Sequence, residues 1–582
     1  MLLFLCLNNA CSSDSDDEPT TPELILSAQE MTFAKSGGTQ TLSIATNAKT
    51  LDVTSQQPSW CIVKEVASNS TKVHKFEVTA QPNSETSARE TAIDVKAGTL
   101  GKSIRVTQGE ADGLLLESTK IENVKATGET VSVKLKSNRS VSIKINDSWI
   151  TKATTRAMQE YTYTFLIATN YGDARTGSIS FTAGDLTESV TITQVKGEKN
   201  ELSGGSPAEV ATTLGMGWNL GNQLDAHING IANETSWGNQ PATQATFDRL
   251  RAAGFQSVRI PVTWMGHIGA APDYQIEEAW MNRVAEVVGY AKQAGLKALI
   301  NIHHDGADSN YWLDIKNAAK DATKNAAVKE QLSAVWRQIA EKFKNEGSYL
   351  IFESMNEIHD GSWGWGENKT DGGKQYQTLN EWNQVFVDAV RATGGENSTR
   401  FLGIATYCTD PEIAVNGSFV LPNDAVTNRL LVSVHYYAPS EYSLECKYAE
   451  WGHTGAADKK PNWGDEAYVK STFGKLKQTF IDAGIPVYIG EMGATHRSNA
   501  REEMFRKYYL EYVCKAAKEY GLTPFYWDNG SSGAGKECSG IINHATGAWQ
   551  NNGEEVATLM VKAVTNTDAS YTLESVYNNA PQ

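Results

Sequence analysis

The stretch FDRLRAAGFQSVRIPV, residues 247–262, places a helix directly before a strand. Residues 247–254, FDRLRAAG, are amphipathic and end in Gly254, the signal of a helix and its C-terminal cap. Residues 256–262, QSVRIPV, form a short apolar run rich in β-branched side chains, as in a buried strand. The same order of helix, glycine and strand recurs along the chain, and this recurrence decides the fold.

Seven further strand candidates accompany this one. They are GMGWNLGN (215–222), KALINIHH (297–304), LIFESMNE (350–357), RFLGIATY (400–407), LLVSVHYY (430–437), PVYIGEMG (486–493) and TPFYWDNG (523–530). Amphipathic stretches such as WMNRVAEVVGYAKQAG separate them. Eight β-then-α units predict an α/β fold, a (β/α)8 TIM barrel over residues 207–566. An open doubly wound sheet is the alternative, but no GxGxxG or P-loop follows the first strand.

The N-terminal part of the chain shows a different pattern, which occurs twice. Short runs such as TQTLSIAT and HKFEVTAQ alternate polar and apolar residues between Gly, Asn and Ser. PSWCIV is echoed by DSWITK, and Arg89 and Gln108 recur 86 residues later as Arg175 and Gln194. The repeat predicts two tandem all-β immunoglobulin-like sandwiches, residues 24–110 and 111–197, followed by a linker at 196–206.

Size and charge restrict the class of partner. The chain has 582 residues and a net charge of −16, which argues against nucleic acid, because proteins that bind phosphate backbones present basic patches. No apolar run is long enough to span a bilayer. The seven cysteines show no CxxC pair or zinc spacing. One disulfide among Cys408, Cys446, Cys514 and Cys538 stays open as an alternative, with free buried thiols favoured.

The first residues, MLLFLCLNNACSSDSDDE, resemble a bacterial lipoprotein signal. An apolar stretch leads to Ala10 and then to Cys11, which would be lipidated and become the mature N-terminus. The stretch is short and lacks a basic segment before it. The acidic run after Cys11 resembles the tag that sends such lipoproteins to the outer face of the outer membrane. We therefore expect residues 1–23 to be a signal and acidic tether at the cell surface; a disordered acidic tail is the alternative.

Polar residues stand at the ends of seven of the eight predicted barrel strands. In a (β/α)8 barrel the functional residues lie at the C-terminal ends of the strands, so this ring predicts an active site. Its members in chain order are Asn219, Asn222, Arg259, His303, His304, Asn356, Glu357, His435, Tyr437, Glu491 and Trp527.

Several reaction classes can be tested against this ring. Serine catalysis on an α/β-hydrolase fold requires GxSxG, which is absent. His303, His304 and Asp305 stand together, but adjacent strand residues point to opposite faces, and no HxH or HExxH spacing occurs. We expect no metal and no cofactor. Two carboxyl groups on different strands instead fit glycoside hydrolysis.

Glu357 and Glu491 are the two carboxyl groups that barrel closure would bring together. A retaining mechanism needs them about 5–5.5 Å apart. A nucleophile must stay ionised, and Arg259 and Tyr437 can supply charge and hydrogen bonds for that; the acid must hold its proton, which burial and a neighbouring carboxylate favour. Asn356 suits the sugar 2-hydroxyl.

Six motifs together resemble glycoside hydrolase family 5: TFDRLRAAGFQSVRIPVTW, INIHHD, FESMNE, VSVHYY, YIGEMG and FYWDNG. With the additional motif GMGWNLGNQLDA they resemble its subfamily 4. Members are endo-β-1,4-glucanases, many acting on xyloglucan and mixed-linkage glucan. The resemblance implies Glu357 as acid/base and Glu491 as nucleophile. It carries over Arg259, His303, Asn356, His435, Tyr437 and Trp527 as the surrounding shell. Ile358 departs from the family, which often has proline there.

The N-terminal repeats resemble BACON domains, which suggests sugar binding; rigid spacers are the favoured alternative.

Other residues near these motifs need separate interpretation. Glu353 lies about four residues deeper than Glu357 on the same strand face, so we expect a buried structural carboxylate. Asp360 and His359 lie past the strand end, and we expect solvated loop residues. His304 is equally compatible with binding sugar and with a structural role, and we group it with Asn219 and Asn222 as substrate-binding candidates.

The tryptophans divide by position. Trp280, Trp336 and Trp382 fall on predicted helices and are expected to pack in the core. Loop tryptophans at the mouth of the barrel could stack on sugar rings, and Trp527 would form the floor under the sugar at the cleavage point. The loop candidates are Trp312, Trp363, Trp365, Trp451 and Trp463.

The sequence therefore predicts a retaining endo-β-1,4-glucanase that acts on plant cell-wall glucans as a surface-anchored monomer. An endo-β-1,4-mannanase or a broad hemicellulase on the same barrel remains open. A non-catalytic glycan-binding lipoprotein is less favoured, because both carboxyl groups are present.

Overall fold

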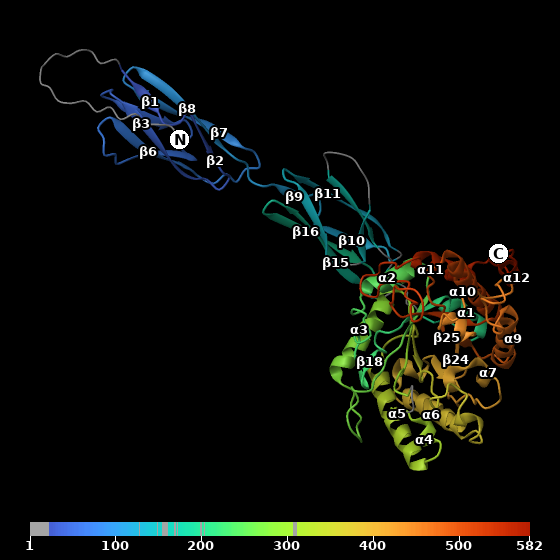
Figure 1. Cartoon of the computed structure of the whole chain (residues 1–582). Helices are drawn as coiled ribbons and strands as arrows, with labels where there is room; N and C mark the ends of the chain where they lie inside the picture. The colour runs from blue at the N-terminus through green and yellow to red at the C-terminus, as the bar shows by residue number, and fades with distance from the viewer. Residues whose placement is uncertain are drawn as a thin grey trace, which may run out of the picture.

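The computed structural model of the chain describes residues 22–582 except 127, 148, 154–160, 168–169, 171–172, 198–200, 203 and 307–310. Two β-rich bodies and one larger α/β body follow one another in chain order (Figure 1). Cys11 and the proposed signal lie outside the described residues. Among the residues that the structure describes, no helix is both long and apolar enough to cross a membrane.

Each N-terminal body is a sandwich of two four-stranded sheets with the same strand order. In the first, β1-β3-β6-β5 pack against β2-β8-β7-β4, and in the second, β9-β11-β14-β13 pack against β10-β16-β15-β12. The predicted tandem repeat is thus confirmed as a fold. The first eight strands are β1 Leu24–Leu26, β2 Glu30–Phe33, β3 Gly38–Thr46, β4 Leu51–Ser55, β5 Cys61–Val66, β6 Val73–Ala80, β7 Arg89–Ala97 and β8 Leu100–Gln108. The next eight are β9 Leu114–Leu116, β10 Lys120–Val124, β11 Glu129–Ser137, β12 Val141–Ile145, β13 Ile150–Ala153, β14 Tyr161–Ile167, β15 Arg175–Ala183 and β16 Leu186–Gln194.

The repeated residues form the same buried arrangement at one end of each sandwich, which we call the latch. In the first module the Arg89 guanidinium lies 4.5 Å from the ring centre of Trp60, and its Nε donates to Gln108 Oε1 at 2.9 Å. In the second, Arg175 lies 4.4 Å from the ring centre of Trp149 and donates to Gln194 Oε1 at 2.8 Å. Both tryptophans are buried. A sugar could not stack on indoles covered in this way.

The latch end of the first module contacts the second module. Lys35 Nζ donates to Asp112 Oδ2 at 2.6 Å and to Asp185 Oδ2 at 2.9 Å, and Asn138 Nδ2 donates to the carbonyl of Thr86 at 3.4 Å. The charge of Asp248, on the barrel helix α2 (Gln244–Ala252), acts on Arg175 in the latch of the second module.

The C-terminal body is a closed barrel of eight parallel strands, as predicted. Each strand ends earlier than the apolar run that predicts it, because the last residues of each run leave the ladder to form the mouth of the barrel. The strands are β17 Gly217–Leu220, β20 Ser257–Ile260, β21 Lys297–Ile300, β22 Leu350–Glu353, β23 Leu402–Ala405, β24 Leu430–Tyr436, β25 Val487–Met492 and β26 Thr523–Asp528. A small hairpin, β18 His227–Ile228 and β19 Ile231–Ala232, follows the first of them.

Helices surround the barrel, and several end in glycine before the next strand. Gly295 and Gly521 cap their helices in the left-handed conformation, at φ 74° and 78°. The longer helices are α1 Pro207–Leu214, α2 Gln244–Ala252, α3 Glu278–Ala294, α5 Ala322–Lys342, α6 Lys374–Arg391, α9 Glu466–Leu476, α10 Ala500–Tyr520 and α11 Gly553–Thr565. Shorter ones are α4 Ile315–Ala318, α7 Pro411–Ala414, α8 Ser440–Ser443 and α12 Leu573–Asn578.

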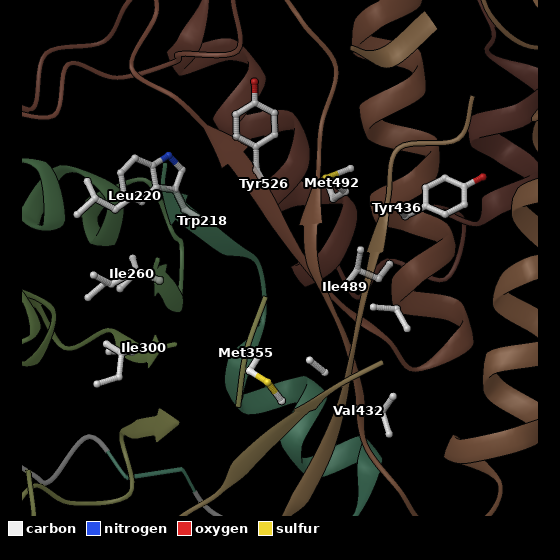
Figure 2. Close-up of a cluster of buried hydrophobic side chains, with 14 of the residues drawn as sticks. Trp218, Leu220, Ile260, Ile300, Met355, Val432, Tyr436, Ile489, Met492 and Tyr526 are labelled. Atoms are coloured by element: carbon white, nitrogen blue, oxygen red, sulfur yellow. The ribbon is translucent and has the colours of Figure 1, made fainter. Parts of the chain in front are cut away.

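The barrel interior is layered. Its floor is an apolar cluster in which Leu299, Ile351 and Leu431 from the strands meet Leu202 and Leu214 from the linker and α1. Side chains of alternate strand positions, including Ile260, Ile300 and Val432, belong to the main apolar cluster that also contains the surrounding helices (Figure 2). Polar side chains occupy the interior above the floor, so the sequence builds a packed base that carries a polar site.

The cysteines described by the structure, Cys61, Cys408, Cys446, Cys514 and Cys538, are all free thiols. The favoured expectation of free thiols is confirmed for the four barrel cysteines. Cys446 and Cys538 are half-buried rather than buried.

Candidate active site

Arg259 is the centre of a buried polar network at the barrel mouth. It lies on β20 with no exposed surface. Its Nε donates to Glu353 Oε2 at 2.7 Å, its Nη1 to Glu491 Oε1 at 2.9 Å, and its Nη2 to Asn356 Oδ1 at 2.7 Å. One guanidinium therefore fixes three side chains from β22, β25 and the segment after β22.

Glu353 is the buried structural carboxylate that its depth in the strand predicts. Besides Arg259, its oxygens accept hydrogen bonds from Asn301 Nδ2 at 2.8 Å, Ser433 Oγ at 2.7 Å and Tyr488 OH at 2.7 Å. Four donors on two oxygens satisfy a buried charge, which would otherwise be costly.

Glu357 and Glu491 meet beside His435. The His435 Nδ1 lies 2.7 Å from Glu357 Oε1 and 3.7 Å from Glu491 Oε2, and one ligand atom of each of the three lies within 4.8 Å of the other two. Tyr437 OH donates to Glu491 Oε2 at 3.1 Å. This close approach is the short carboxylate separation of a retaining glycosidase, in which no room is left for a water between the two groups.

The two carboxyl groups differ in their surroundings. Burial raises the pKa of Glu491, and the charge of Glu357 adds to this effect while His435 and Arg259 oppose it. Burial also disfavours ionised Glu357, but the charge and hydrogen bond of His435, with the charges of His359 and His304, lower the pKa of that carboxyl. This order is the reverse of the sequence-based expectation, because His435 bonds to Glu357 rather than to Glu491. The separation of 2.7 Å between His435 Nδ1 and Glu357 Oε1 is that of a hydrogen bond, which places one proton between these two atoms.

His303 and Trp527 lie face to face under the pair. Their rings are stacked with centres 5.9 Å apart, and His303 Nε2 is 3.9 Å from Glu491 Oε1. Burial, with the charges of His304 and Arg259, lowers the pKa of His303 well below its usual value, so this ring is neutral. Gly221 permits the arrangement, since a Cβ there would lie 2.7 Å from the Trp527 ring.

His303 and His304 do not point to opposite faces, contrary to the prediction from strand alternation. The strand β21 ends at Ile300, so both histidines lie in irregular backbone, and their ring centres are 4.4 Å apart. One ligand atom each of Asp225, His303 and His304 lies within 4.8 Å of the others. The Asp225 carboxylate also accepts the backbone N–H groups of Asn222 and Gln223, at 3.2 and 2.8 Å.

An open cleft of about 830 Å³ contains both carboxyl groups. Of the predicted sugar-stacking tryptophans, Trp363, Trp365 and Trp463 line it and are 55%, 82% and 42% exposed. Asn222, His304 and Trp527 line it as well. Trp237 lines it too and is missing from the sequence-based candidates, although it stands on the loop after the first strand and meets the criterion applied to the others.

Two predicted substrate contacts, Asn219 and Trp451, are wrong because both side chains are buried, and a third, Trp312, is not among the residues that line the cleft. Asn219 is fully buried, where its Oδ1 accepts from Arg259 at 3.1 Å and its Nδ2 donates to the Gly490 carbonyl at 2.8 Å, so it positions Arg259. Trp451 is 1% exposed and packs against α10. Trp312 is half-buried outside the cleft, with its Nε1 donating to Asp305 Oδ1 at 2.6 Å. The sequence places these residues near the mouth but does not show which way they point.

His359 and Asp360 are also not solvated, contrary to expectation. Asp360 is buried and accepts the backbone N–H groups of Ser362 and Asn368, at 3.1 and 3.2 Å, which shapes the loop after Glu357. The His359 ring lies 4.3 Å from that of Trp363, whose own φ of 49° is rare for a bulky residue. The loop is thus folded upon itself, and it presents Trp363 to the cleft. The expected packing of Trp280, Trp336 and Trp382 is confirmed, since all three are buried.

A pair of close carboxyl groups in a cleft at the C-terminal mouth of a (β/α)8 barrel defines a retaining glycoside hydrolase. The comparisons agree. The model of the family Cellulase (glycosyl hydrolase family 5) matches residues 222–533, more than half of the chain, so the chain belongs to glycosyl hydrolase family 5. The BACON model, a putative binding domain, matches residues 50–109 and 139–195.

Characterised relatives and solved structures resemble the barrel. Endoglucanase A of Paenibacillus barcinonensis is 37% identical over 342 residues, 56% of this chain and 83% of the relative. A xyloglucan-specific endo-β-1,4-glucanase of Bacteroides ovatus is 36% identical over 55% of this chain and 64% of the relative. The structure of a GH5-4 broad-specificity endoglucanase from Bacteroides salanitronis is 61% identical, covering 63% of this chain and 97% of that chain with a TM-score of 0.62.

Proposed function

We propose that this protein is a retaining endo-β-1,4-glucanase that hydrolyses internal links of plant cell-wall glucans by double displacement. The observation that carries the proposal is the approach of Glu357 and Glu491 within one open cleft that has exposed tryptophans on its walls. An open cleft lets a long chain lie across the site, which favours internal cleavage. Relatives named endoglucanase support the substrate class.

In the first step Glu491 attacks the anomeric carbon while Glu357 gives the proton it shares with His435 to the leaving oxygen. The C–O bond of the glucan breaks and a glycosyl ester forms on Glu491. In the second step Glu357 takes a proton from water, the water oxygen attacks the anomeric carbon, and Glu491 leaves as a carboxylate. Two inversions retain the β-configuration.

The side chains around the two carboxyl groups have separate roles in catalysis. Arg259 and Tyr437 bond to different oxygens of Glu491, so the attacking oxygen and its direction are fixed before substrate arrives. Asn356 is held by Arg259 Nη2 through its Oδ1, which leaves its Nδ2 to donate toward a sugar 2-hydroxyl. That contact strengthens as positive charge develops in the transition state.

The test replaces each carboxyl group by its amide. Glu357→Gln and Glu491→Gln should retain glucan binding and lose about 10³-fold or more in kcat. Glu445→Gln is the matched control, because Glu445 is an exposed carboxylate on the same cleft and should leave kcat within about twofold. Near wild-type kcat in either catalytic variant would contradict the assignment, as would an α-anomer as the first product in NMR.

Two classes of glycan, β-glucans and mannan, are the candidates for the preferred substrate. We favour a β-glucan, because relatives at 36% identity are named for xyloglucan. A reducing-sugar assay on carboxymethyl cellulose, mixed-linkage glucan, xyloglucan and mannan, with sizing of the products, separates the candidates. Mannan as the best substrate would favour the mannanase alternative, and mainly mono- or disaccharide products from the start would contradict internal cleavage.

We further propose that the two sandwiches are spacers and that Cys11 carries a lipid anchor at the outer membrane. The buried latch tryptophans support the spacer role. Deleting residues 24–197 should leave kcat/KM on soluble glucan unchanged, and a large loss would show that the modules shape the site. Cys11→Ser should move the protein from the membrane fraction to the soluble fraction; membrane retention would exclude the anchor. We expect a monomer, which light scattering tests.

A further inference from the structure

A buried polar network lies behind the cleft wall that the ends of β17 and β26 form with the loops after them. Asn222, Trp237 and Trp527 stand on this wall and line the cleft. The centre of the network is His544, which is 2% exposed and belongs to the segment between β26 and α11. Its backbone carbonyl accepts from Thr246 Oγ1 at 2.7 Å, so α2 holds this segment from the outside.

Asp528 is the carboxylate on one side of the His544 ring. It follows Trp527 directly and has no exposed surface. Five N–H groups point at its two oxygens. At Oδ1 they are Gly530 N at 2.8 Å and His544 Nε2 at 3.2 Å, and at Oδ2 they are Trp218 Nε1 at 3.1 Å, Ile541 N at 3.0 Å and Ile542 N at 3.3 Å. A carboxyl group surrounded by donors is favoured in its ionised form, in which it can only accept from His544.

Gln223 lies on the other side of the ring and also accepts. Its Oε1 is 3.0 Å from His544 Nδ1, while its Nε2 donates to Glu234 Oε1 at 3.0 Å and to the Gln240 carbonyl at 2.9 Å. Turning the amide over would place its oxygen against these two acceptors. The hydrogen-bond partners of Gln223 therefore fix the orientation of its amide.

Both ring nitrogens of His544 thus face acceptors. A neutral imidazole has one N–H and would direct a lone pair at Gln223 or at Asp528, whereas an imidazolium donates on both sides. Asp528 compensates the buried positive charge. Glu234, the second anion of the network, is paired with Arg283 through two hydrogen bonds of 2.8 Å. The network is therefore balanced in charge, as buried ions require.

The His544 ring connects two parts of the cleft wall that lie far apart in the sequence. Gln223 follows Asn222 on the loop after β17, and Asp528 follows Trp527 at the end of β26. Each partner of the ring is therefore the direct chain neighbour of a residue that lines the cleft. A change in the ring that moved either partner would move the wall.

We propose that His544 is a positioning residue, a buried imidazolium that holds Trp527 and Asn222 in fixed positions relative to each other on the cleft wall. The inference rests on the proposed glucanase function, and it assigns a residue that acts on substrate binding from behind the wall. The ring itself does not touch substrate. The two catalytic carboxyl groups are held separately, by Arg259 and His435, so losing the bridge should weaken glucan binding more than it slows the chemical step.

The first test reads the protonation of the ring by nitrogen NMR at pH 7, on the full chain labelled with isotope-enriched histidine. His544→Gln assigns the signal by its disappearance, and Gln223→Leu, which removes the acceptor at Nδ1, should shift the same signal. Both ring nitrogens of His544 should carry a proton. A ring with one protonated and one bare nitrogen would overturn the proposal, whatever the activity of the protein.

The second test measures kcat and KM on soluble β-glucan. His544→Gln should raise KM about tenfold and leave kcat within about threefold, because an amide cannot donate to both partners. His453→Gln is the matched control, since His453 also bonds to a carboxylate, Glu466 at 2.9 Å, but does not line the cleft. The control should leave KM within about twofold. Urea denaturation verifies that each variant is folded.

A double variant separates the bridge from a general loss of stability. Gln223→Leu and His544→Gln break the same connection, so together they should raise KM no more than the larger single effect. Additive effects would overturn the proposal, as would an unchanged KM in His544→Gln or a fall in kcat alone. If the wild type hydrolysed no β-glucan, the glucanase function would fail, and the NMR result would still report on the ring.

Discussion

Glu353→Gln removes the charge that Arg259 shares with the proposed nucleophile. Arg259 donates to Glu353 through Nε at 2.7 Å and to Glu491 through Nη1 at 2.9 Å, and both it and Glu353 have no exposed surface. The amide can keep its oxygen toward Arg259 and Asn301 and turn its NH2 toward the hydroxyls of Ser433 and Tyr488, which are able to accept. The variant should therefore fold.

This geometry gives the expected loss of stability and the expected loss of activity in Glu353→Gln. Neutralising one partner of a buried ion pair costs about 3–5 kcal/mol, and the low end applies because Arg259 keeps Glu491 as a partner. Losing Glu353 also frees the guanidinium to shift toward Glu491, and a misplaced catalytic group costs about 10²-fold in kcat/KM. With one negative charge fewer nearby, the pKa of Glu491 should fall. The acid limb of the pH profile, which reports ionisation of the nucleophile, should therefore move to lower pH.

The assay combines urea denaturation with kcat/KM on soluble glucan between pH 4 and 8. Tyr488→Phe is the control, since it removes one hydrogen bond to Glu353 at 2.7 Å without changing the charge. It should cost about 1 kcal/mol and leave the acid limb in place. An acid limb that stays fixed in Glu353→Gln would refute the link between Glu353 and the nucleophile, even if stability fell.

Three further predictions concern other parts of the barrel. Burial raises the pKa of Asp305 to about 6, so the protonated carboxyl contributes its full stability below a pH of about 4 and this contribution is lost as the pH rises through 6. In Asp305→Asn the free energy of unfolding, measured by urea titration, should therefore change less with pH between pH 4 and 7. The same pH dependence in the variant as in the wild type would contradict this. In Gly490→Ala the new Cβ would lie 3.1 Å from His435 Nε2 and push the ring from Glu357, so kcat should fall about tenfold with KM little changed; a wild-type kcat would show that the ring has room. Trp451→Ala should cost about 3–5 kcal/mol in thermal or urea unfolding while oligosaccharide affinity stays constant, whereas weaker binding would restore Trp451 to the cleft.

The sequence predicts the barrel and its carboxylate pair because both depend on order along the chain. Apolar runs alternate with amphipathic ones along the chain, and in a (β/α)8 barrel the active site lies at the C-terminal ends of the strands. Glu353 could be assigned a structural role because strand rise alone places it below Glu357.

The direction of loop side chains could not be predicted in the same way. Trp451 and Trp463 both follow the sixth barrel strand, yet the Trp451 indole turns inward to donate to the Gly464 carbonyl at 2.8 Å, while Trp463 stays 42% exposed. Asp360 accepts hydrogen bonds from backbone N–H groups of its own loop, and residue spacing in the sequence does not predict these bonds. Which carboxyl group His435 touches, Glu357 at 2.7 Å rather than Glu491 at 3.7 Å, is likewise a matter of folded geometry that spacing in the sequence does not contain.

The latch that ends each sandwich has a consequence for how far the enzyme reaches. The first latch end contacts the second module, and the charge of Asp248 on the barrel acts on the second latch. The two junctions therefore lie at the same end of their modules, although they use different residues, Lys35 in the first and Arg175 in the second. The length of chain between residue 24 and the catalytic barrel could therefore change by whole sandwiches, with no change to the barrel itself.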